Sequence, residues 1–269
     1  MAEWMAVSPF LAVYMTVLAA LLGAVLASFG GCVAARLVTG ESFVRGRSHC
    51  ASCGHTLSPK DLVPIFSWLF LKGKCRYCGA SVPAVYPVTE MLGAAMFALL
   101  LWRYGLTLQT LEYCVLVILL LILSLVDWDS GLIPDRVLVG GIVNFALFTL
   151  LRGEGVSGLL HGLLSGLTVS IPLLILVLVM DKVLGRESMG GGDIKLFFAV
   201  GLYFPLSELL VVVILSCLLG IALALVTRRT TGDGENPKAF PFGPAIGLGT
   251  AAALLCAQPV LEWYLGLFV

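Results

Sequence analysis

Charged side chains are scarce in this sequence: Asp, Glu, Lys and Arg make up only 12% of its 269 residues, whereas apolar residues make up 59%. A soluble globular domain carries about 25% charged residues. Roughly half of the usual solvating side chains are therefore missing. This deficit excludes a large soluble catalytic domain and predicts an all-α polytopic membrane protein.

An excess of positive charge is absent as well. The 16 basic residues balance 16 acidic ones, so the formal net charge is zero and we expect no nucleic-acid partner. No G-x-G-x-x-G loop follows a strand pattern, so this motif identifies no site for a nucleotide or a methyl donor. The sequence leaves the oligomeric state open.

Long apolar runs are abundant. A membrane helix needs about 20 apolar residues, so such runs predict about eight transmembrane helices. The predicted spans are Pro9–Val38, Val88–Tyr104, Leu111–Val126, Val137–Leu151, Leu159–Val183, Ile194–Phe204, Leu206–Thr227 and Phe242–Leu267. The sixth is short, with weakly marked ends.

The distribution of Lys and Arg predicts the orientation of these spans. If the N-terminus lies outside, 14 of the 16 basic residues fall on one side, and only Arg103 and Arg152 fall on the other. Cytoplasmic loops carry the excess of basic residues. We therefore expect a multi-pass membrane protein with both termini outside and the long first loop in the cytoplasm.

That first loop, residues 39–86, is the one polar segment long enough to fold by itself. It contains Cys50 and Cys53, then Cys75 and Cys78, each pair followed directly by glycine. Two C-x2-C pairs at this spacing are typical of a tetrahedral zinc site. Two disulfides are the alternative, but stable disulfides are rare in the reducing cytoplasm. We predict structural zinc on the four cysteines.

Acidic residues stand at the ends of two predicted spans, on the predicted cytoplasmic side. The third span ends in a segment with Asp127, Asp129 and Asp135, and the sixth begins with Gly190-Gly191-Gly192-Asp193. Asp193 could simply cap a helix. A second acidic cluster on the same side instead favours a pair of carboxylates, in which one member keeps a proton and the two act as acid and base.

Three classes of function are consistent with such residues. A carboxylate pair can activate water for direct attack on an amide, as in an aspartic protease. Acidic residues within a membrane also carry protons in proton-coupled transporters, although transporters usually have these residues near the midplane of the bilayer. The third class is a membrane scaffold whose zinc loop binds a partner, but a scaffold function would not explain the aspartates. Asp127, Asp129 and Asp135 remain competing partners for Asp193 at this level.

Taken in order, the motifs resemble the type IV prepilin peptidases, a family of GxGD-type membrane aspartic proteases. The matching segments are Ser28-Phe29, Arg36-Leu37, His49-Cys50, Cys53-Gly54, Asp61–Pro64, Ser67–Leu69, Cys75 with Cys78, Tyr86-Pro87, Glu90, Asp127, Ile133–Asp135, Gly190–Lys195 and Pro241–Pro244. Each match is weak alone, but together they are specific.

The resemblance implies a catalytic pair of Asp127 and Asp193, supported by Gly190 and Gly192 of the GxGD loop. It implies an enzyme of the bacterial inner membrane that removes the short basic leader of a prepilin or pseudopilin at the cytoplasmic face. The cut would follow a glycine that directly precedes the hydrophobic helix of the substrate. The resemblance also implies that S-adenosylmethionine then methylates the new amino terminus. Three regions are expected: a first transmembrane helix (1–38), the four-cysteine zinc module with the methyltransferase part (39–86), and the peptidase core (87–269).

Overall fold

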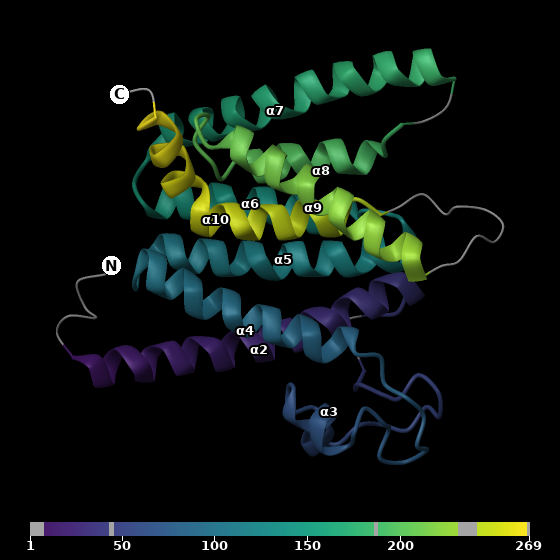
Figure 1. The fold of residues 1–269 in the computed structure, drawn as a ribbon. Coiled ribbons are helices and arrows are strands. Elements are labelled where there is room, and N and C mark those ends of the chain that lie inside the picture. Colours follow the sequence, from purple (N-terminus) through teal and green to yellow (C-terminus); the bar gives the residue numbers. More distant parts are fainter. Residues whose placement is uncertain (1–7, 43–45, 186–187, 231–240, 268–269) are drawn as a thin grey trace. The chain divides into compact units, whose positions relative to one another are not determined.

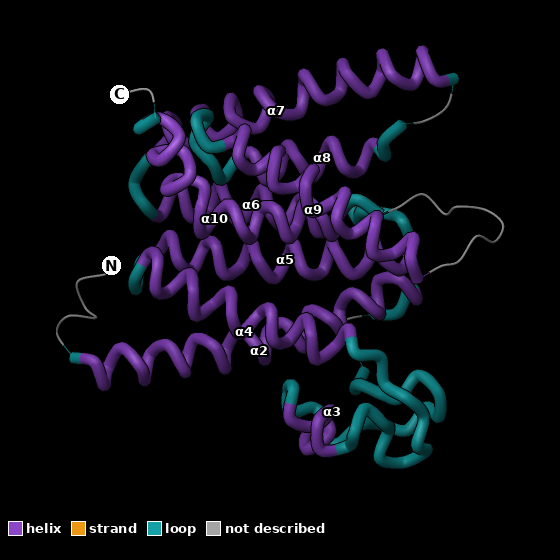
Figure 2. The backbone as a smooth tube through the Cα atoms, viewed as in Figure 1, coloured by secondary structure: helices purple, strands orange, loops and turns teal. Residues whose placement is uncertain are grey.

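The computed structural model describes residues 8–42, 46–185, 188–230 and 241–267, with the backbone alone for 227–230. Residues 1–7 and 268–269 of the expected first and last regions, and residues 43–45 of the expected zinc module, lie outside this part. The described residues form helices joined by loops, with no strand among them (Figure 2). The all-α prediction is therefore confirmed.

The chain divides into two compact units, residues 1–110 and 111–269. The first contains α2 (Pro9–Thr39), the short helices η1 (Pro59–Asp61) and α3 (Phe66–Phe70), and α4 (Val85–Tyr104). Helix α5 (Leu108–Ser130) begins at the boundary and lies almost wholly in the second unit. The other helices of that unit are α6 (Asp135–Leu151), α7 (Gly155–Leu184), α8 (Gly191–Gly201), α9 (Leu209–Thr230) and α10 (Gly243–Leu265) (Figure 1).

In the first unit, α2 and α4 pack together through small residues. A Cβ atom added to Gly93 would lie 2.5 Å from the Cβ of Ala27 and 2.7 Å from the carbonyl oxygen of Gly23. Close approach of two backbones at glycine is the usual way in which membrane helices associate. The polar segment between the two helices forms a separate loop module that contains η1 and α3.

In the second unit, α8 packs against α6, α7 and α10, and α9 packs against α10. Glycines again permit the closest contacts. A Cβ atom on Gly201 of α8 would lie 2.8 Å from the Cα of Gly166 on α7, and one on Gly249 of α10 would lie 2.5 Å from Oγ of Ser216 on α9. The short helix α8 is thereby held among its longer neighbours.

Within the described residues, six helices are long and apolar enough to cross a membrane: α2, α4, α5, α7, α9 and α10. The other two expected spans are helical but shorter, with 17 residues in α6 and 11 in α8. At 1.5 Å per residue, α8 rises only about 16 Å, roughly half of the hydrocarbon thickness. The multi-pass membrane architecture is confirmed.

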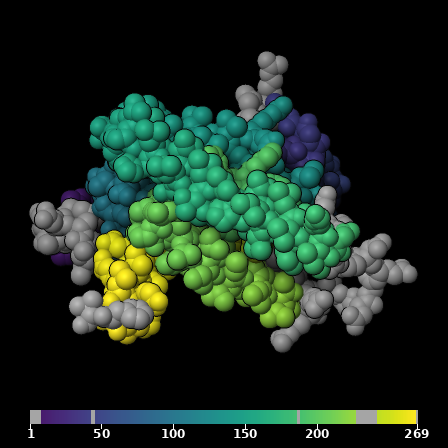
Figure 3. All heavy atoms as spheres, turned by 90° about the horizontal axis from the view of Figure 1, so that it is seen from above, coloured from purple at the N-terminus to yellow at the C-terminus, as the bar shows by residue number. Residues whose placement is uncertain are grey.

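The outer surface of the helices is apolar. Helix α7, on the near face in Figure 3, exposes a series of Leu, Ile and Val side chains, among them Ile175, Leu176 and Leu178. An apolar surface of this extent would be unfavourable in water. It is the surface that a helix presents to lipid.

Candidate functional site

The four cysteines of the loop module come together. Their sulfur atoms all lie within 4.8 Å of one another, and Sγ of Cys50 is 3.9 Å from Sγ of Cys78. A tetrahedral zinc ion with Zn–S bonds of about 2.3 Å places its sulfur ligands about 3.8 Å apart. All eight cysteines of the chain are free thiols. The cluster can therefore hold a metal ion, and its spacing fits zinc.

Two similar turns present these thiols. The amide of Gly54 donates to the carbonyl of Cys50 over 2.8 Å, and the amide of Gly79 donates to the carbonyl of Cys75 over 3.0 Å. Both glycines have positive φ values, +70° and +73°, which a residue with a Cβ rarely adopts. The repeated C-x2-C-G sequence thus folds twice into the same turn.

Hydrogen bonds from the backbone favour the thiolate form of Cys50. The amides of Cys53 and Ser52 lower the pKa of the Cys50 thiol to about 6, because they stabilise its thiolate. His49 and His55 do not belong to the metal-binding group. The ring of His55 instead stacks on Tyr77, with centroids 3.7 Å apart.

Asp61 connects the η1 turn to the second cysteine turn. Its carboxylate accepts hydrogen bonds from the backbone and hydroxyl of Ser58, from Nε of Arg76 at 2.6 Å and from the hydroxyl of Tyr77 at 3.0 Å. The bonds to Ser58 and Arg76 hold the pKa of Asp61 well below its usual value. The carboxylate is therefore ionised at neutral pH and serves as a fixed anchor.

Glu90 of α4 anchors the module to the helix that follows it. This buried side chain accepts a hydrogen bond of 2.6 Å from the amide of Ile65, a residue with a φ of +64°. A β-branched residue in that region is strained. The hydrogen bond to Glu90 offsets this strain at the start of α3.

The second unit brings the aspartates of α5 and α8 into one region. Asp127, in the last turn of α5, is only 5% exposed, and its Oδ2 accepts a hydrogen bond of 2.7 Å from the amide of Gly243. Asp193, in the first turn of α8, is partly buried. The charges of the two aspartates act on each other, and the Asp193 carboxylate also interacts with the backbone of Gly190.

The other candidate acids lie at the surface. Asp129 is exposed, and Asp135 forms an exposed ion pair of 2.8 Å with Lys195. Among the three acids that compete for the role of partner to Asp193, Asp127 is the buried one. A buried carboxylate beside a second carboxylate is the arrangement that acid–base chemistry requires.

Helix N-termini and glycines surround this carboxylate pair. Gly243 is the first residue of α10, so its free amide and the positive end of the helix dipole face Asp127. A Cβ atom on Gly243 would lie 2.6 Å from Oδ2 of Asp127. A Cβ atom on Gly192 would lie 3.1 Å from the Cβ of Ile133, in the turn between α5 and α6. These small residues permit the close approach of segments distant in the chain.

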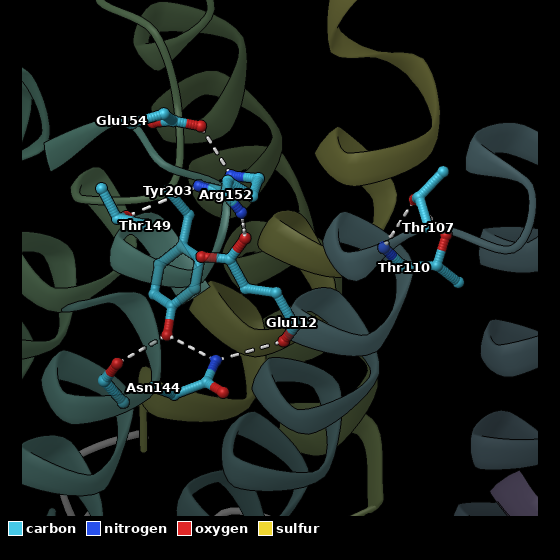
Figure 4. A network of polar contacts seen from close by, with 9 residues as sticks. Thr107, Thr110, Glu112, Asn144, Thr149, Arg152, Glu154 and Tyr203 are labelled. Carbon is cyan, nitrogen blue, oxygen red and sulfur yellow. Dashed lines mark hydrogen bonds and ion pairs between the residues drawn. The ribbon is translucent and has the colours of Figure 1, made fainter. Parts of the chain in front are cut away.

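A polar network fixes α8 beyond its last turn (Figure 4). The Tyr203 hydroxyl donates to the carbonyl of Gly141 over 2.5 Å, and Nδ2 of Asn144 donates to that hydroxyl over 2.9 Å and to the carbonyl of Glu112 over 3.1 Å. The Glu112 carboxylate pairs with Arg152. This network joins α5, α6 and the end of α8, so it limits movement of α8 along its axis.

Sequence reasoning did not identify Gly243 as part of the site, or Asn144 and Tyr203 as parts of the network beyond the end of α8. Gly243 lies in the segment Pro241–Pro244, where a glycine before a proline at the start of an apolar run could have indicated a helix N-terminus. Asn144 and Tyr203 are isolated polar residues inside apolar runs. Such residues must find partners in a membrane, but the sequence does not say which.

Two family models match most of the chain. A model described as the Bacterial Peptidase A24 N-terminal domain matches residues 21–104, and one described as the Type IV leader peptidase family matches residues 114–225. No solved structure matches the chain.

Curated relatives carry one name, prepilin leader peptidase/N-methyltransferase. The relative from Bacillus subtilis strain 168 is 32% identical, and the match covers 90% of this chain and 95% of the relative. Those from Aeromonas salmonicida strain A449 and Pseudomonas aeruginosa are also 32% identical, over 81% and 83% of this chain and 74% and 76% of the relatives. The chain therefore belongs to the type IV leader peptidase family.

Proposed function

We propose that this protein removes the leader of a prepilin or pseudopilin with a pair of aspartates, Asp127 and Asp193. The observation that carries the proposal is the buried Asp127 at the end of α5, within electrostatic reach of Asp193 at the start of α8. Membership of the leader peptidase family favours this function over a proton-coupled transporter built on the same acids.

The chemistry follows from two close carboxylates that share one proton. The ionised carboxylate removes a proton from water, whose oxygen attacks the carbonyl carbon of the scissile amide. The protonated carboxyl donates its proton to the carbonyl oxygen. The tetrahedral intermediate then collapses and the C–N bond breaks. The leaving nitrogen takes the proton that the first carboxylate removed from water, and the second carboxylate recovers its proton from the hydroxyl on the former carbonyl carbon, which restores the pair. Gly190 and Gly192 act as supporting residues that let the Asp193 loop approach closely.

The four-cysteine module is proposed to hold structural zinc through Cys50, Cys53, Cys75 and Cys78. The sulfur spacing supports this ion, since four thiolates and a closed shell are typical of structural sites. Zinc there would fix the two turns and carry no step of the cleavage.

The same protein is proposed to methylate the new amino terminus. S-adenosylmethionine would supply the methyl group to the amine nitrogen, with S-adenosylhomocysteine and a proton as the other products. The curated relatives are named for both activities. We place the methyltransferase part in residues 39–86 and the peptidase core in residues 87–269, and we assign no described residue to the methyl donor.

The proposed orientation puts both termini outside and the aspartates at the cytoplasmic face of a bacterial inner membrane. It is supported by the excess of basic residues on that side, 14 against 2. A substrate helix in the bilayer would then present its unwound leader junction to Asp127 and Asp193.

Substitution of the aspartates tests the cleavage proposal. Asp127→Asn and Asp193→Asn should each reduce leader removal by at least about 100-fold, because each removes one partner of the acid–base pair. Membranes with the full chain are incubated with a candidate prepilin, and the products are weighed by mass spectrometry. Loss of the leader reports cleavage, and an added methyl group reports the second activity.

Asp129→Asn is the matched control, because Asp129 lies two residues from Asp127 but is exposed. It should keep the kcat of the unaltered protein, because an exposed carboxylate outside the pair takes no part in the proton transfers. Full processing by Asp127→Asn or Asp193→Asn, at equal protein levels, would contradict the assignment.

A further inference from the structure

An apolar groove with a volume of about 460 Å³ runs between α6, α7 and α8. Helix α8 contributes Ile194, Lys195 and Phe198 to its lining, so the groove begins at the residue that follows Asp193. Asp135 and Lys195, which form an exposed ion pair, mark the same end. The groove therefore has one charged end beside the proposed catalytic carboxylate and an apolar body that leads away from it.

The walls of the groove follow the helical repeat. Helix α6 lines it with Asp135, Leu138, Val139 and Ile142, which are residues i, i+3, i+4 and i+7. Such a stripe runs along one face of a helix for about two turns, roughly 10 Å.

The opposite wall, on α7, has the same spacing: Leu167, Ser170, Ile171 and Leu174. The hydroxyl of Ser170 donates to the carbonyl of Gly166, so this wall presents no free donor to the groove. Two parallel ridges with this spacing are the surface against which a third helix packs.

The helix arrangement keeps the groove open toward the charged end. Helices α6 and α7 approach each other at the end remote from Asp193, where a Cβ atom on Gly158 would lie 2.7 Å from Cγ2 of Thr149. From there α7 rises away from α8 toward its C-terminal end (Figure 1). Pro172 interrupts the hydrogen bonds of α7 within the groove wall, where it permits a bend.

We propose that this groove binds the first turns of the substrate's apolar helix and so delivers the leader junction to Asp193. The inference rests on the proposed peptidase function and names the surface that selects the substrate. An apolar helix entering between the ridges of α6 and α7 would bury Ile142 and Leu174, which are 36% and 43% exposed. The residues before that helix would then lie at the charged end.

The charges at that end favour a basic peptide over a lipid. Segments 127–136 and 190–195 together carry four carboxyl groups, Asp127, Asp129, Asp135 and Asp193, against two cations, Arg136 and Lys195. Because the pair of Asp127 and Asp193 shares one proton, three negative charges remain against two positive ones. This excess of negative charge complements a basic leader. It would repel the phosphate of a phospholipid headgroup, so an acyl chain alone is the poorer occupant.

Bulky substitutions inside the groove test the proposal. The probe is a synthetic peptide with a basic leader, a glycine junction and a 20-residue apolar segment, added to membranes that contain the full chain. Ile142→Trp and Leu174→Trp should each raise KM for this peptide at least about 10-fold and change kcat less than about 2-fold, because they remove binding space without touching the carboxylates.

Neighbouring residues supply matched controls. Val143→Trp and Ile175→Trp place the same side chain on the same helices, at positions that are exposed but do not line the groove. Both should keep the KM of the unaltered protein. Unchanged KM in Ile142→Trp and Leu174→Trp would overturn the groove proposal while leaving the peptidase function intact. Failure of the unaltered protein to cut the peptide would instead count against the function itself.

Crosslinking gives a second measurement that needs no bulky variant. A benzophenone side chain in the first apolar turn of the peptide is activated by light in membranes that contain the Asp193→Asn protein. Adducts should map to the three helices that line the groove, α6, α7 and α8. Adducts confined to lipid or to other helices would overturn the proposal.

Discussion

The thiol cluster of the first unit and the carboxylate site of the second are built in different ways. Cys50 and Cys78 are 28 positions apart, and two copies of one short turn supply all four thiols. Asp127 and the amide that binds it are 116 positions apart, on α5 and α10. A short sequence motif thus specifies the thiol cluster, whereas the carboxylate site depends on the packing of several helices.

The forces that hold the two regions differ accordingly. The loop module is too small for a large apolar core. Its folded structure depends on the hydrogen bonds of Asp61 and Glu90 and on the metal ion that its thiols can hold. The carboxylate site depends on close helix contacts at Gly192 and Gly243. Removal of the metal-binding thiols should therefore destabilise the loop module, and a methyl group added at a glycine should disturb the carboxylate site.

The largest expected effect is the loss of the thiol ligands. Cys50→Ser combined with Cys78→Ser should remove the bound zinc and unfold the loop module, because zinc binding contributes about 10–16 kcal/mol in zinc-finger peptides. Metal analysis of the purified protein and proteolysis of the loop measure these effects. Methylation should fall further than leader removal.

The matched control changes two thiols elsewhere. The double variant Cys217→Ser/Cys256→Ser changes one thiol in α9 and one in α10, and it should leave the zinc content unaltered. A purified, unaltered protein without zinc, or a double variant that retains it, would contradict the module as described.

An intermediate effect is expected from one added methyl group at Gly243. Gly243→Ala would bring its Cβ to 2.6 Å from Oδ2 of Asp127, so the carboxylate must move from its present position. A displacement near 1 Å at a catalytic group costs about 100-fold in rate, and we expect kcat for leader removal to fall by about 10- to 100-fold. Kinetics on a synthetic prepilin peptide measure the effect.

Gly191→Ala serves as the comparison, because a Cβ atom there meets nothing within 4 Å. It should retain the rate of the unaltered protein, although it lies in the same glycine-rich loop as Asp193. Equal rates for Gly243→Ala and Gly191→Ala would show that the contact with Asp127 does not position the carboxylate.

The smallest effect is expected at Asp61. Asp61→Asn removes a carboxylate that binds Arg76 and Tyr77, and it should weaken zinc retention about 10-fold, since hydrogen bonds to charged groups contribute about 1.5–3 kcal/mol. Competition with a chelator measures it, with the exposed neighbour Lys60→Gln as control.

The pH dependence of this effect follows from the lowered pKa of Asp61. A lowered carboxyl pKa gives stability that is fully present above the unfolded value of about 3.9 and is lost only as the pH falls through the folded value. The difference between Asp61→Asn and the unaltered protein should therefore stay constant from pH 6 to pH 8. A difference that changes across this window would contradict the anchor role.

Sequence reasoning succeeded where a motif was local or a run was long. It predicted the helical membrane architecture and the four thiols, because apolar length and C-x2-C spacing are properties of neighbouring residues. The residues alone left Asp127, Asp129 and Asp135 as competitors, since burial depends on distant helices, and only the resemblance to the family selected Asp127. Sequence reasoning also gave two spans whose helices, α6 and α8, are shorter than a usual membrane helix.

The sequence by itself determined that this is a helical membrane protein with a four-thiol module and acids at the ends of two apolar runs. Only the tertiary structure decided that Asp127 is the buried acid, that the amide of Gly243 binds it, and that α6, α7 and α8 leave a groove beside Asp193. The physical reason is that composition and short spacings act along the chain. By contrast, the burial of a side chain and the contact between two helix ends arise only when segments distant in the sequence pack together.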